Sequence, residues 1–146
     1  MPVPGRRDVL TRAMRILGLI AILLSAQPAA AQLSCATPQK PMMEIELMFG
    51  RNIGGRLGVT ESRWAKFLAR EVTPRFPDGL TVTDTTGQWR DAKTKALVRE
   101  RGKMVRIIMP MDAAAQEKID AIAAAYKKQF RQDSVGVLTR PACVSF

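Results

Sequence analysis

The order of strand-like and helix-like apolar patterns constrains this chain most strongly. Four segments have the alternation or the β-branched composition of strands, namely residues 43–49, 80–90, 103–109 and 134–146. Two segments place apolar side chains at helical spacing, namely residues 61–72 and 112–131. The chain therefore runs strand, helix, strand, strand, helix, strand, an order that few closed architectures satisfy.

A four-stranded antiparallel sheet with both helices on one face is the simplest closure of that order. We therefore predict an α+β, ferredoxin-like βαββαβ fold, in which the first strand lies between the third and the last. Residues 96–100 are expected to return as an edge ribbon, and Pro141 is expected to interrupt the last strand. The apolar stripe of the second helix is expected in the core, with the tyrosine hydroxyl hydrogen-bonded: Ala115, Ile119, Ile122, Tyr126 and Phe130.

Residues 1–31 have the three parts of a secretory signal peptide. Four arginines precede an apolar run of eleven residues at 16–26, and a small-residue site follows at 29–31. Such a run is too short to cross a bilayer, which takes about 20 residues. A buried N-terminal helix does not explain this combination. We therefore expect a mature chain that begins near Gln32, contains no transmembrane helix, and is periplasmic or secreted in a bacterium.

Two details of export stay open. Arg6 and Arg7 resemble a twin-arginine signal, but no Ser or Thr precedes them and the apolar run is strongly hydrophobic, so general secretion is favoured. Lipid anchoring at Cys35 is the less favoured alternative to cleavage after Ala31. The reason is that Leu33 stands two residues before the cysteine, where a lipoprotein signal places leucine three before it.

The mature chain is predicted to be one domain with a short lead-in. Residues 32–41 are polar and contain two prolines, and residues 42–146 are long enough for a single core. Cys35 and Cys143, the two cysteines of the chain, stand near its ends, and in an oxidising compartment an even pair indicates a disulfide. The predicted fold independently brings both to the margin between the first and last strands. The bond would stabilise the fold by about 4 kcal/mol.

The net charge of the mature chain and the distribution of its basic residues limit the classes of partner that can be predicted. Removing residues 1–31 takes away four arginines and one aspartate, which leaves 19 basic and 12 acidic residues. The basic residues are scattered and few aromatics accompany them, so no nucleic-acid partner is predicted. An anionic ligand or envelope component is the expected kind of partner, although a solvated basic surface that aids solubility is the simpler explanation.

The residue types that the chain lacks exclude several kinds of catalysis and of metal binding. The chain has no histidine, which removes Ser-His-Asp and Cys-His catalysis and the commonest metal ligand. Two cysteines in a disulfide cannot bind zinc, so no metal site and no cofactor are predicted. Residues 50–57 have the spacing of a phosphate-binding loop but lack its lysine and its hydroxyl residue. An anion-binding loop is one interpretation of this segment, and an ordinary surface loop is the alternative. The candidate anion loop consists of Arg51, Gly54, Gly55 and Arg56.

Charged residues are expected on the sheet face away from the helices. Glu44, Glu46 and Arg106 alternate there with buried apolar residues, and a cross-strand ion pair is their simplest role. Catalysis is the alternative, with Glu46 as base and Arg106 orienting an acidic substrate. Met48 and Ile108 share this face, and subunit interfaces bury such mixtures, so a homodimer about a two-fold axis is a further hypothesis.

Four segments resemble one bacterial family. They are residues 46–50 (ELMFG), 72–81 (VTPRFPDGLT), 87–90 (GQWR) and 141–146 (PACVSF). These motifs are similar to the family catalogued as domain of unknown function 3574, and the similarity covers roughly residues 42–146. The resemblance implies a small exported or lipid-anchored protein with one intact domain and no assigned activity.

Three residues in or beside these motifs are candidate binding residues. Arg75 and Trp89 could bind a carboxylate or a sugar acid near Asp84. In the structural alternative, Asp84 pairs with Arg75 and Trp89 covers the sheet edge. We expect an exported, disulfide-closed envelope domain that binds rather than catalyses. A cofactor-independent enzyme acting on a small acidic substrate at the open sheet face is the alternative, so the question of enzymatic activity stays open.

Overall fold

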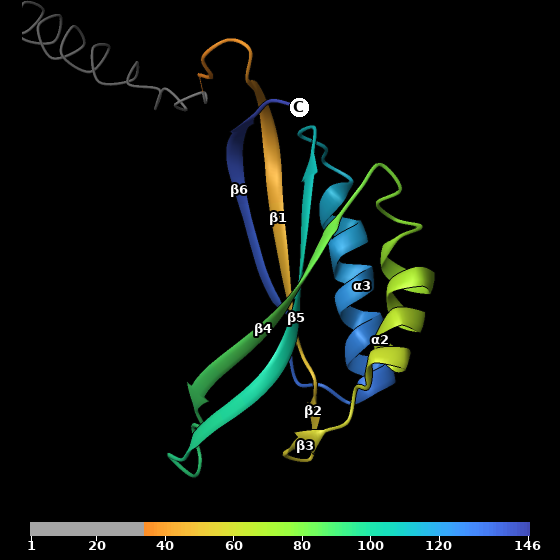
Figure 1. The fold of residues 1–146 in the computed structure, drawn as a ribbon, viewed down its shortest axis with the longest axis vertical. Coiled ribbons are helices and arrows are strands. Elements are labelled where there is room, and N and C mark those ends of the chain that lie inside the picture. Colours follow the sequence, from red (N-terminus) through yellow and green to blue (C-terminus); the bar gives the residue numbers. More distant parts are fainter. Residues whose placement is uncertain (1–33) are drawn as a thin grey trace, which may run out of the picture. The chain divides into compact units, whose positions relative to one another are not determined.

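The protein is described by a computed structural model over residues 34–146, so the predicted leader and its cleavage point lie outside the described residues. Four antiparallel strands form the main sheet in the order β4-β5-β1-β6 (Figure 1). These strands are β1 (Lys40–Gly50), β4 (Thr81–Arg90), β5 (Leu97–Met109) and β6 (Gly136–Val144). The first strand of the sheet therefore lies between the third and the last, which confirms the predicted ferredoxin-like arrangement.

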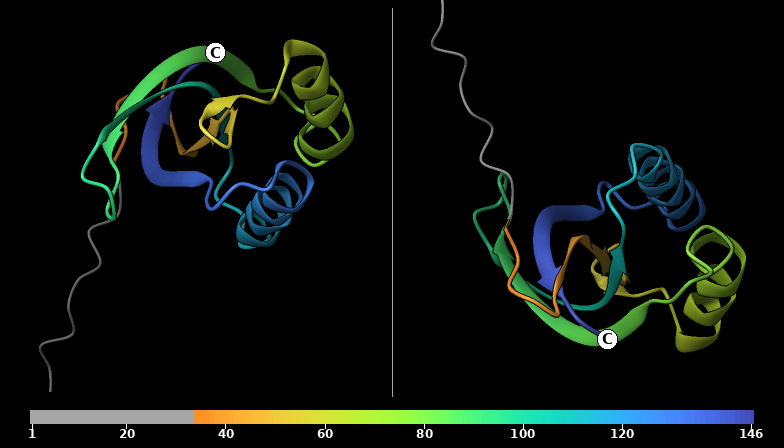
Figure 2. Two further views of the ribbon diagram at one scale, coloured as in Figure 1. Left: turned by 90° about the horizontal axis from the view of Figure 1, so that it is seen from below. Right: turned by 90° about the horizontal axis from the view of Figure 1, so that it is seen from above.

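The two helices cover one face of this sheet, as predicted (Figures 1 and 2). Helix α2 (Glu61–Phe67) begins at Thr60, whose Oγ1 accepts a hydrogen bond from the Arg63 N–H at 3.3 Å, and it continues as a π-helical turn over Leu68–Val72. Helix α3 (Ala115–Phe130) lies beside it. Within residues 34–146, no helix is both long and apolar enough to cross a bilayer.

The core lies between the helices and the inner face of the sheet. All five residues of the predicted α3 stripe are buried, as are Ile45 and Leu47 of β1 and Val105 and Ile107 of β5. Tyr126 stands at the centre of an aromatic cluster, with ring centroids 4.7 Å from Phe49 and 4.7 Å from Phe130. Its hydroxyl donates to the Gly50 carbonyl oxygen at 2.7 Å, which confirms the predicted hydrogen bond, and burial raises the pKa of Tyr126 above its ordinary value.

One prediction about the strands was confirmed and another was wrong. Residues 97–100 return as an edge ribbon against residues 87–90 of β4, and this ribbon is the start of β5, which is continuous from Leu97 and pairs with β4 beyond the point where its pairing with β1 ends at Gly102. Pro141 does not interrupt β6, where it is paired with Met43 of β1. Since β6 is an edge strand bonded on one side only, the missing N–H of a proline can be accommodated there.

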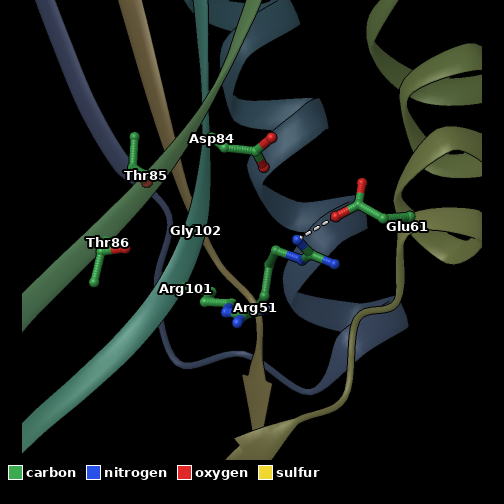
Figure 3. A pocket seen from close by; sticks show the side chains of 7 residues that line it. All are labelled: Arg51, Glu61, Asp84, Thr85, Thr86, Arg101 and Gly102. Atoms are coloured by element: carbon green, nitrogen blue, oxygen red, sulfur yellow. Dashed lines mark hydrogen bonds and ion pairs between the residues drawn. The ribbon is translucent and has the colours of Figure 1, made fainter.

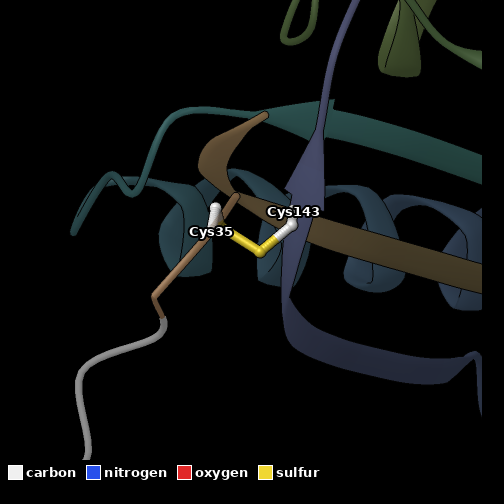
Figure 4. Close-up of a disulfide and its surroundings, with 2 residues drawn as sticks. All are labelled: Cys35 and Cys143. Atoms are coloured by element: carbon white, nitrogen blue, oxygen red, sulfur yellow. A yellow bond between two sulfur atoms is a disulfide. The ribbon is translucent and has the colours of Figure 1, made fainter. Parts of the chain in front are cut away.

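The disulfide between Cys35 and Cys143 is present, which confirms that prediction (Figure 4). The sulfur atoms are 2.06 Å apart and the Cα atoms 5.5 Å apart, within the usual geometry of the bond. Cys143 is paired with Pro41 near the start of β1, so the bond joins the lead-in to the end of β6. It closes a loop across a sequence separation of 108 residues.

A small hairpin follows β1, where a single loop was predicted. Its strands are β2 (Asn52–Ile53) and β3 (Arg56–Leu57). Gly54 and Gly55 form the turn with φ angles of 59° and 77°, a left-handed conformation that glycine adopts without a steric penalty.

Candidate functional site

The outward face of the sheet, opposite the helices, carries the charged residues that the strand alternation placed there. Arg106 Nη2 is 2.7 Å and Arg106 Nε 3.0 Å from Glu46 Oε1. Arg106 Nε is also 3.0 Å from Glu44 Oε1. Both glutamates therefore share one guanidinium group. The expected cross-strand ion pair is present, and ligand binding by these side chains stays a prediction.

Arg140 completes this ion-pair network and was missed by sequence reasoning. Its Nε donates to Glu44 Oε2 at 2.8 Å, because β6 places Arg140 directly opposite Glu44. The assumed break at Pro141 hid this register. The hydrogen bond from Arg140 is the main cause that lowers the pKa of Glu44, and the nearby charge of Arg106 adds to it. Glu44 is therefore an ionised partner of two arginines near neutral pH.

The outward face is hollowed where β1, β4 and β5 lie side by side. The hollow has a volume of about 340 Å³, within the range of small-molecule sites. Gly50, Gly87 and Gly102, one from each strand, line it. A Cβ atom on Gly50 would lie 2.8 Å from Glu100 Oε1, and one on Gly102 would lie 2.7 Å from Thr85 Oγ1. A Cβ atom on Gly87 would meet no other group within 4 Å.

Apolar side chains form the rim of this hollow. Met48, Met104 and Trp89 line it, and Trp89 is 50% exposed. One carboxylate also lines it, that of Glu100, whose Oε1 accepts a hydrogen bond from the Asn52 N–H at 2.7 Å. A backbone floor with thioether and indole walls suits a flat, mostly apolar group that also carries a hydrogen-bond donor.

Sequence reasoning did not identify this hollow, although a signal for it was present. Gly87 interrupts a predicted strand and Gly102 lies between the predicted ribbon at 96–100 and the strand at 103–109, and an isolated glycine in a strand often marks a site where another group approaches the backbone. Gly50 was assigned to the neighbouring loop. That the three glycines meet depends on the strand register, which pairs Gly50 with Gly102.

A second pocket, of about 320 Å³, lies on the helix side of β4 and β5 and is charged (Figure 3). Arg51 directs its guanidinium at Glu61 of α2, with Nη1 2.6 Å from Oε1, and donates from Nε to the Val59 carbonyl oxygen. Lys103 Nζ lies 2.9 Å from Glu61 Oε2 and 2.5 Å from Asp84 Oδ1. Two buried cations are thus held by two exposed carboxylates.

The proposed pairing of Asp84 with Arg75 was therefore wrong. Asp84 binds Lys103, and Arg75 binds Glu71 one helical turn earlier, with Nη1 3.0 Å from Oε2. Arg75 lies before β4 and Trp89 near the end of β4, so the structure does not bring these two candidates together. Trp89 lies on the outer ribbon as expected, where it lines the hollow.

The ion pairs around Lys103 set the protonation of this pocket. The hydrogen bond from Lys103 is the largest cause that lowers the pKa of Asp84 and also that of Glu61. Burial opposes the charge of Lys103, but its hydrogen bonds to both carboxylates outweigh burial and raise its pKa. All three groups are therefore charged at neutral pH.

The candidate anion loop is divided between two places. Arg51 is buried and already paired with Glu61, whereas Gly54 and Gly55 form the turn of the β2–β3 hairpin. Arg56 is exposed on that hairpin. Anion binding by this loop remains a prediction, and an anion at Arg51 would have to compete with the carboxylate of Glu61.

Comparison with known proteins identifies the family. Residues 44–146 match the family described as Protein of unknown function (DUF3574), so the chain belongs to that family and the resemblance is confirmed. No curated protein matches the chain.

Two solved structures are similar in fold. One is a phage SAM lyase in complex with S-methyl-5'-thioadenosine, with a TM-score of 0.57 and 16% identity, covering 80% of this chain and 95% of that one. The other is a phage SAM lyase in its apo state, with a TM-score of 0.54 and 15% identity, covering 79% and 92%. At such low identity the likeness shows a shared fold alone.

Proposed function

We propose that the protein is an exported binding domain of the bacterial envelope, and that a small ligand occupies the hollow on the outward face. The observation that carries the proposal is the glycine floor. A Cβ atom on Gly87 would stand in open space, whereas one on Gly50 would collide with Glu100 and one on Gly102 with Thr85 and the Phe49 carbonyl oxygen. The glycines therefore let these groups approach closely and leave backbone exposed beneath an apolar rim. Glycine in a strand interior weakens the strand, so three glycines at one place suggest a use for the space.

Export is supported by two independent features. The first 31 residues have the arrangement of a signal peptide, and the domain that follows is closed by the Cys35–Cys143 bond. Disulfides persist in oxidising compartments outside the bacterial cytoplasm and are rare inside it.

The rim of the hollow suggests the chemistry of the ligand. An exposed indole and two thioethers favour a flat ring, because Trp89 is half exposed whereas Phe49, the other aromatic lining residue, is buried. Glu100 Oε2 makes no hydrogen bond within residues 34–146, so it can accept one from a ligand N–H group. The ligand expected here is therefore a planar, nitrogen-bearing ring.

A titration with S-methyl-5'-thioadenosine tests the proposal. This probe combines a planar ring with a thioether, and a phage SAM lyase of the same fold has been solved in complex with it. Because Trp64 is buried and Trp89 is half exposed, binding at the hollow should change mainly the Trp89 fluorescence. Saturable quenching that is lost in Trp89→Phe is the expected result. No saturable change with this probe or a small set of planar heterocycles would count against a ligand site.

A pair of neighbouring substitutions controls for nonspecific effects. Gly87→Val should fill the hollow and abolish binding, since nothing surrounds a Cβ atom there. Gln88→Val, the adjacent residue on the opposite face of β4, should leave binding unchanged. Equal loss of binding in both variants would contradict the assignment of the site.

Catalysis is the second candidate, and the shared fold with a phage SAM lyase favours it. A general base would have to be free, yet Glu46 is bound by Arg106 through two nitrogen atoms. Incubation with SAM and chromatography of the mixture distinguishes the candidates. A binding domain releases no S-methyl-5'-thioadenosine, whereas release that depends on Glu46, as judged by Glu46→Gln, would establish an enzyme.

A second copy is the other occupant proposed for the outward face. Glu44, Glu46 and their arginine partners are paired within one chain, so their charges do not require a partner across a two-fold axis. Sedimentation equilibrium tests this alternative: a dimer that Ile108→Asp converts to a monomer would show that a second copy covers the outward face at Ile108.

A further inference from the structure

The β4–β5 hairpin continues beyond the body of the sheet as a two-stranded arm, defined here as residues 86–101. The pairing of β5 with β1 ends at Gly102, and the pairs Thr86–Arg101 to Arg90–Leu97 extend past that point. Figure 1 shows the arm directed away from both helices. A four-residue polar turn over 92–95 and its flanking residues form the tip.

The arm is strongly basic, and its positive charges have no acidic partner. It carries two acidic residues and five basic ones, the latter being Arg90, Lys93, Lys95, Arg99 and Arg101. Within residues 34–146 none of the five forms an ion pair, whereas the arginines of the outward face and the cations of the charged pocket do.

Both acidic residues of the arm are already used by the fold. Asp91 Oδ1 accepts hydrogen bonds from the N–H groups of Thr94 and Lys93, and the bonds from Thr94 are the main cause that lowers the pKa of Asp91. Glu100 Oε1 accepts one from Asn52. The carboxylates therefore hold the turn and the base of the arm, and they leave the basic side chains to act on an external anion.

Large apolar side chains accompany this charge. Trp89 and Leu97 are 50% and 51% exposed, and they lie on opposite faces of the arm because Leu97 is paired with Arg90 and Trp89 with Val98. A soluble polyanion would use the charges but would gain nothing from Leu97. A bilayer surface uses both, since anionic headgroups attract Lys and Arg while indole and aliphatic groups enter the interface.

We propose that the arm docks the protein on anionic phospholipid by its tip, so that side chains from both of its faces reach the membrane, with its basic residues among the headgroups and Trp89 and Leu97 in the interface. This inference concerns a different ligand from that of the hollow, although Trp89 belongs to both the hollow and the arm. It also gives the unpaired positive charge of the exported domain a partner that is present in bacterial envelopes.

Sedimentation with vesicles tests the proposal, using phosphatidylethanolamine vesicles with and without phosphatidylglycerol. The disulfide-bonded protein should bind only the anionic vesicles, and added salt should weaken binding. Each Lys or Arg near the surface contributes about fivefold in partitioning, so Lys93→Gln/Arg99→Gln should bind about 25-fold more weakly. The matched control removes two exposed charges from α2 and its π-helical turn: Lys66→Gln/Arg70→Gln should bind within about twofold of wild type.

The fluorescence of Trp89 separates a lipid surface from other polyanions. Trp64 is buried and supplies a constant background, so a blue shift on vesicle binding reports transfer of Trp89 into the interface. Leu97→Ser should weaken vesicle binding but leave binding to soluble polyphosphate unchanged. Equal vesicle binding by the arm and control variants would overturn the proposal. So would binding to vesicles and polyphosphate alike with no blue shift, which would identify a soluble or carbohydrate-linked polyanion as the partner.

Discussion

Alanine substitutions at two glycines of the hollow should have opposite effects on stability. At Gly102, a Cβ atom would lie 2.7 Å from Thr85 Oγ1 and 3.0 Å from the Phe49 carbonyl oxygen, and the latter is backbone that cannot rotate away. Overpacking of this kind costs about 1–3 kcal/mol. At Gly87, no other group lies within 4 Å and φ is not left-handed. Alanine there should stabilise the fold by about 0.4–1 kcal/mol, by restricting the unfolded chain.

Urea unfolding of the oxidised protein, followed by far-UV circular dichroism, measures both effects. The free energy of unfolding of Gly102→Ala should fall below that of Gly87→Ala by about 1.5–4 kcal/mol, with equal m-values. The contrast isolates the local surroundings, because the chemical change is identical at the two positions. A Gly102→Ala variant as stable as wild type would show that β1, β4 and β5 do not approach one another as described, and the glycine floor would lose its structural basis.

Three further predictions concern the rest of the domain. Serine at Cys35 or Cys143 should lower the free energy of unfolding by about 2–4 kcal/mol while the circular dichroism spectrum is retained, and thiol titration of the unreduced, denatured protein should find no free thiol. The pKa values of Glu44 and Glu61 are lowered from the ordinary value of 4.5, and that of Asp84 from 3.8. The ionised carboxylates therefore contribute their full stability above these ordinary values, and the contribution is lost as the pH falls through the lowered pKa values. Unfolding at a series of pH values should therefore show a loss below about pH 4.5 that Asp84→Asn reduces, and an unchanged slope in that variant would argue against the Asp84 ion pair. Tyr126→Phe should cost about 1 kcal/mol, since it removes one buried hydrogen bond and keeps the aromatic contacts; a neutral result would mean that this bond does not hold Gly50 in place.

The fold followed from the sequence because local patterns and global topology agree. The apolar stripe of α3 and the alternation in β1 each assign an element and its buried face, and the order of elements then leaves one simple closure. The disulfide could be anticipated for the same reason, since the topology brings the two cysteines together. The break predicted at Pro141 failed because an edge strand tolerates a proline that a central strand does not.

The site could be predicted only in part, because it depends on contacts across strands. Glu46 and Arg106 lie where the alternation placed them, but the third partner, Arg140, required the register of β6. The pairing of Asp84 with Lys103 was missed because both lie on the inner face at the margin of the core, where a charged residue is not expected from periodicity. The hollow lies where three neighbouring strands each contain a glycine, and the sequence of one strand alone does not show that these glycines are neighbours.

Chemical-shift mapping with S-methyl-5'-thioadenosine tests the central claim most directly. In amide spectra of the labelled protein, this probe should shift the resonances of Gly50, Gly87 and Gly102 and of the residues beside them, and Gly87→Val should remove those shifts. Shifts confined to the charged pocket around Lys103, or shifts that persist unchanged in Gly87→Val, would contradict the assignment of the hollow as the ligand site.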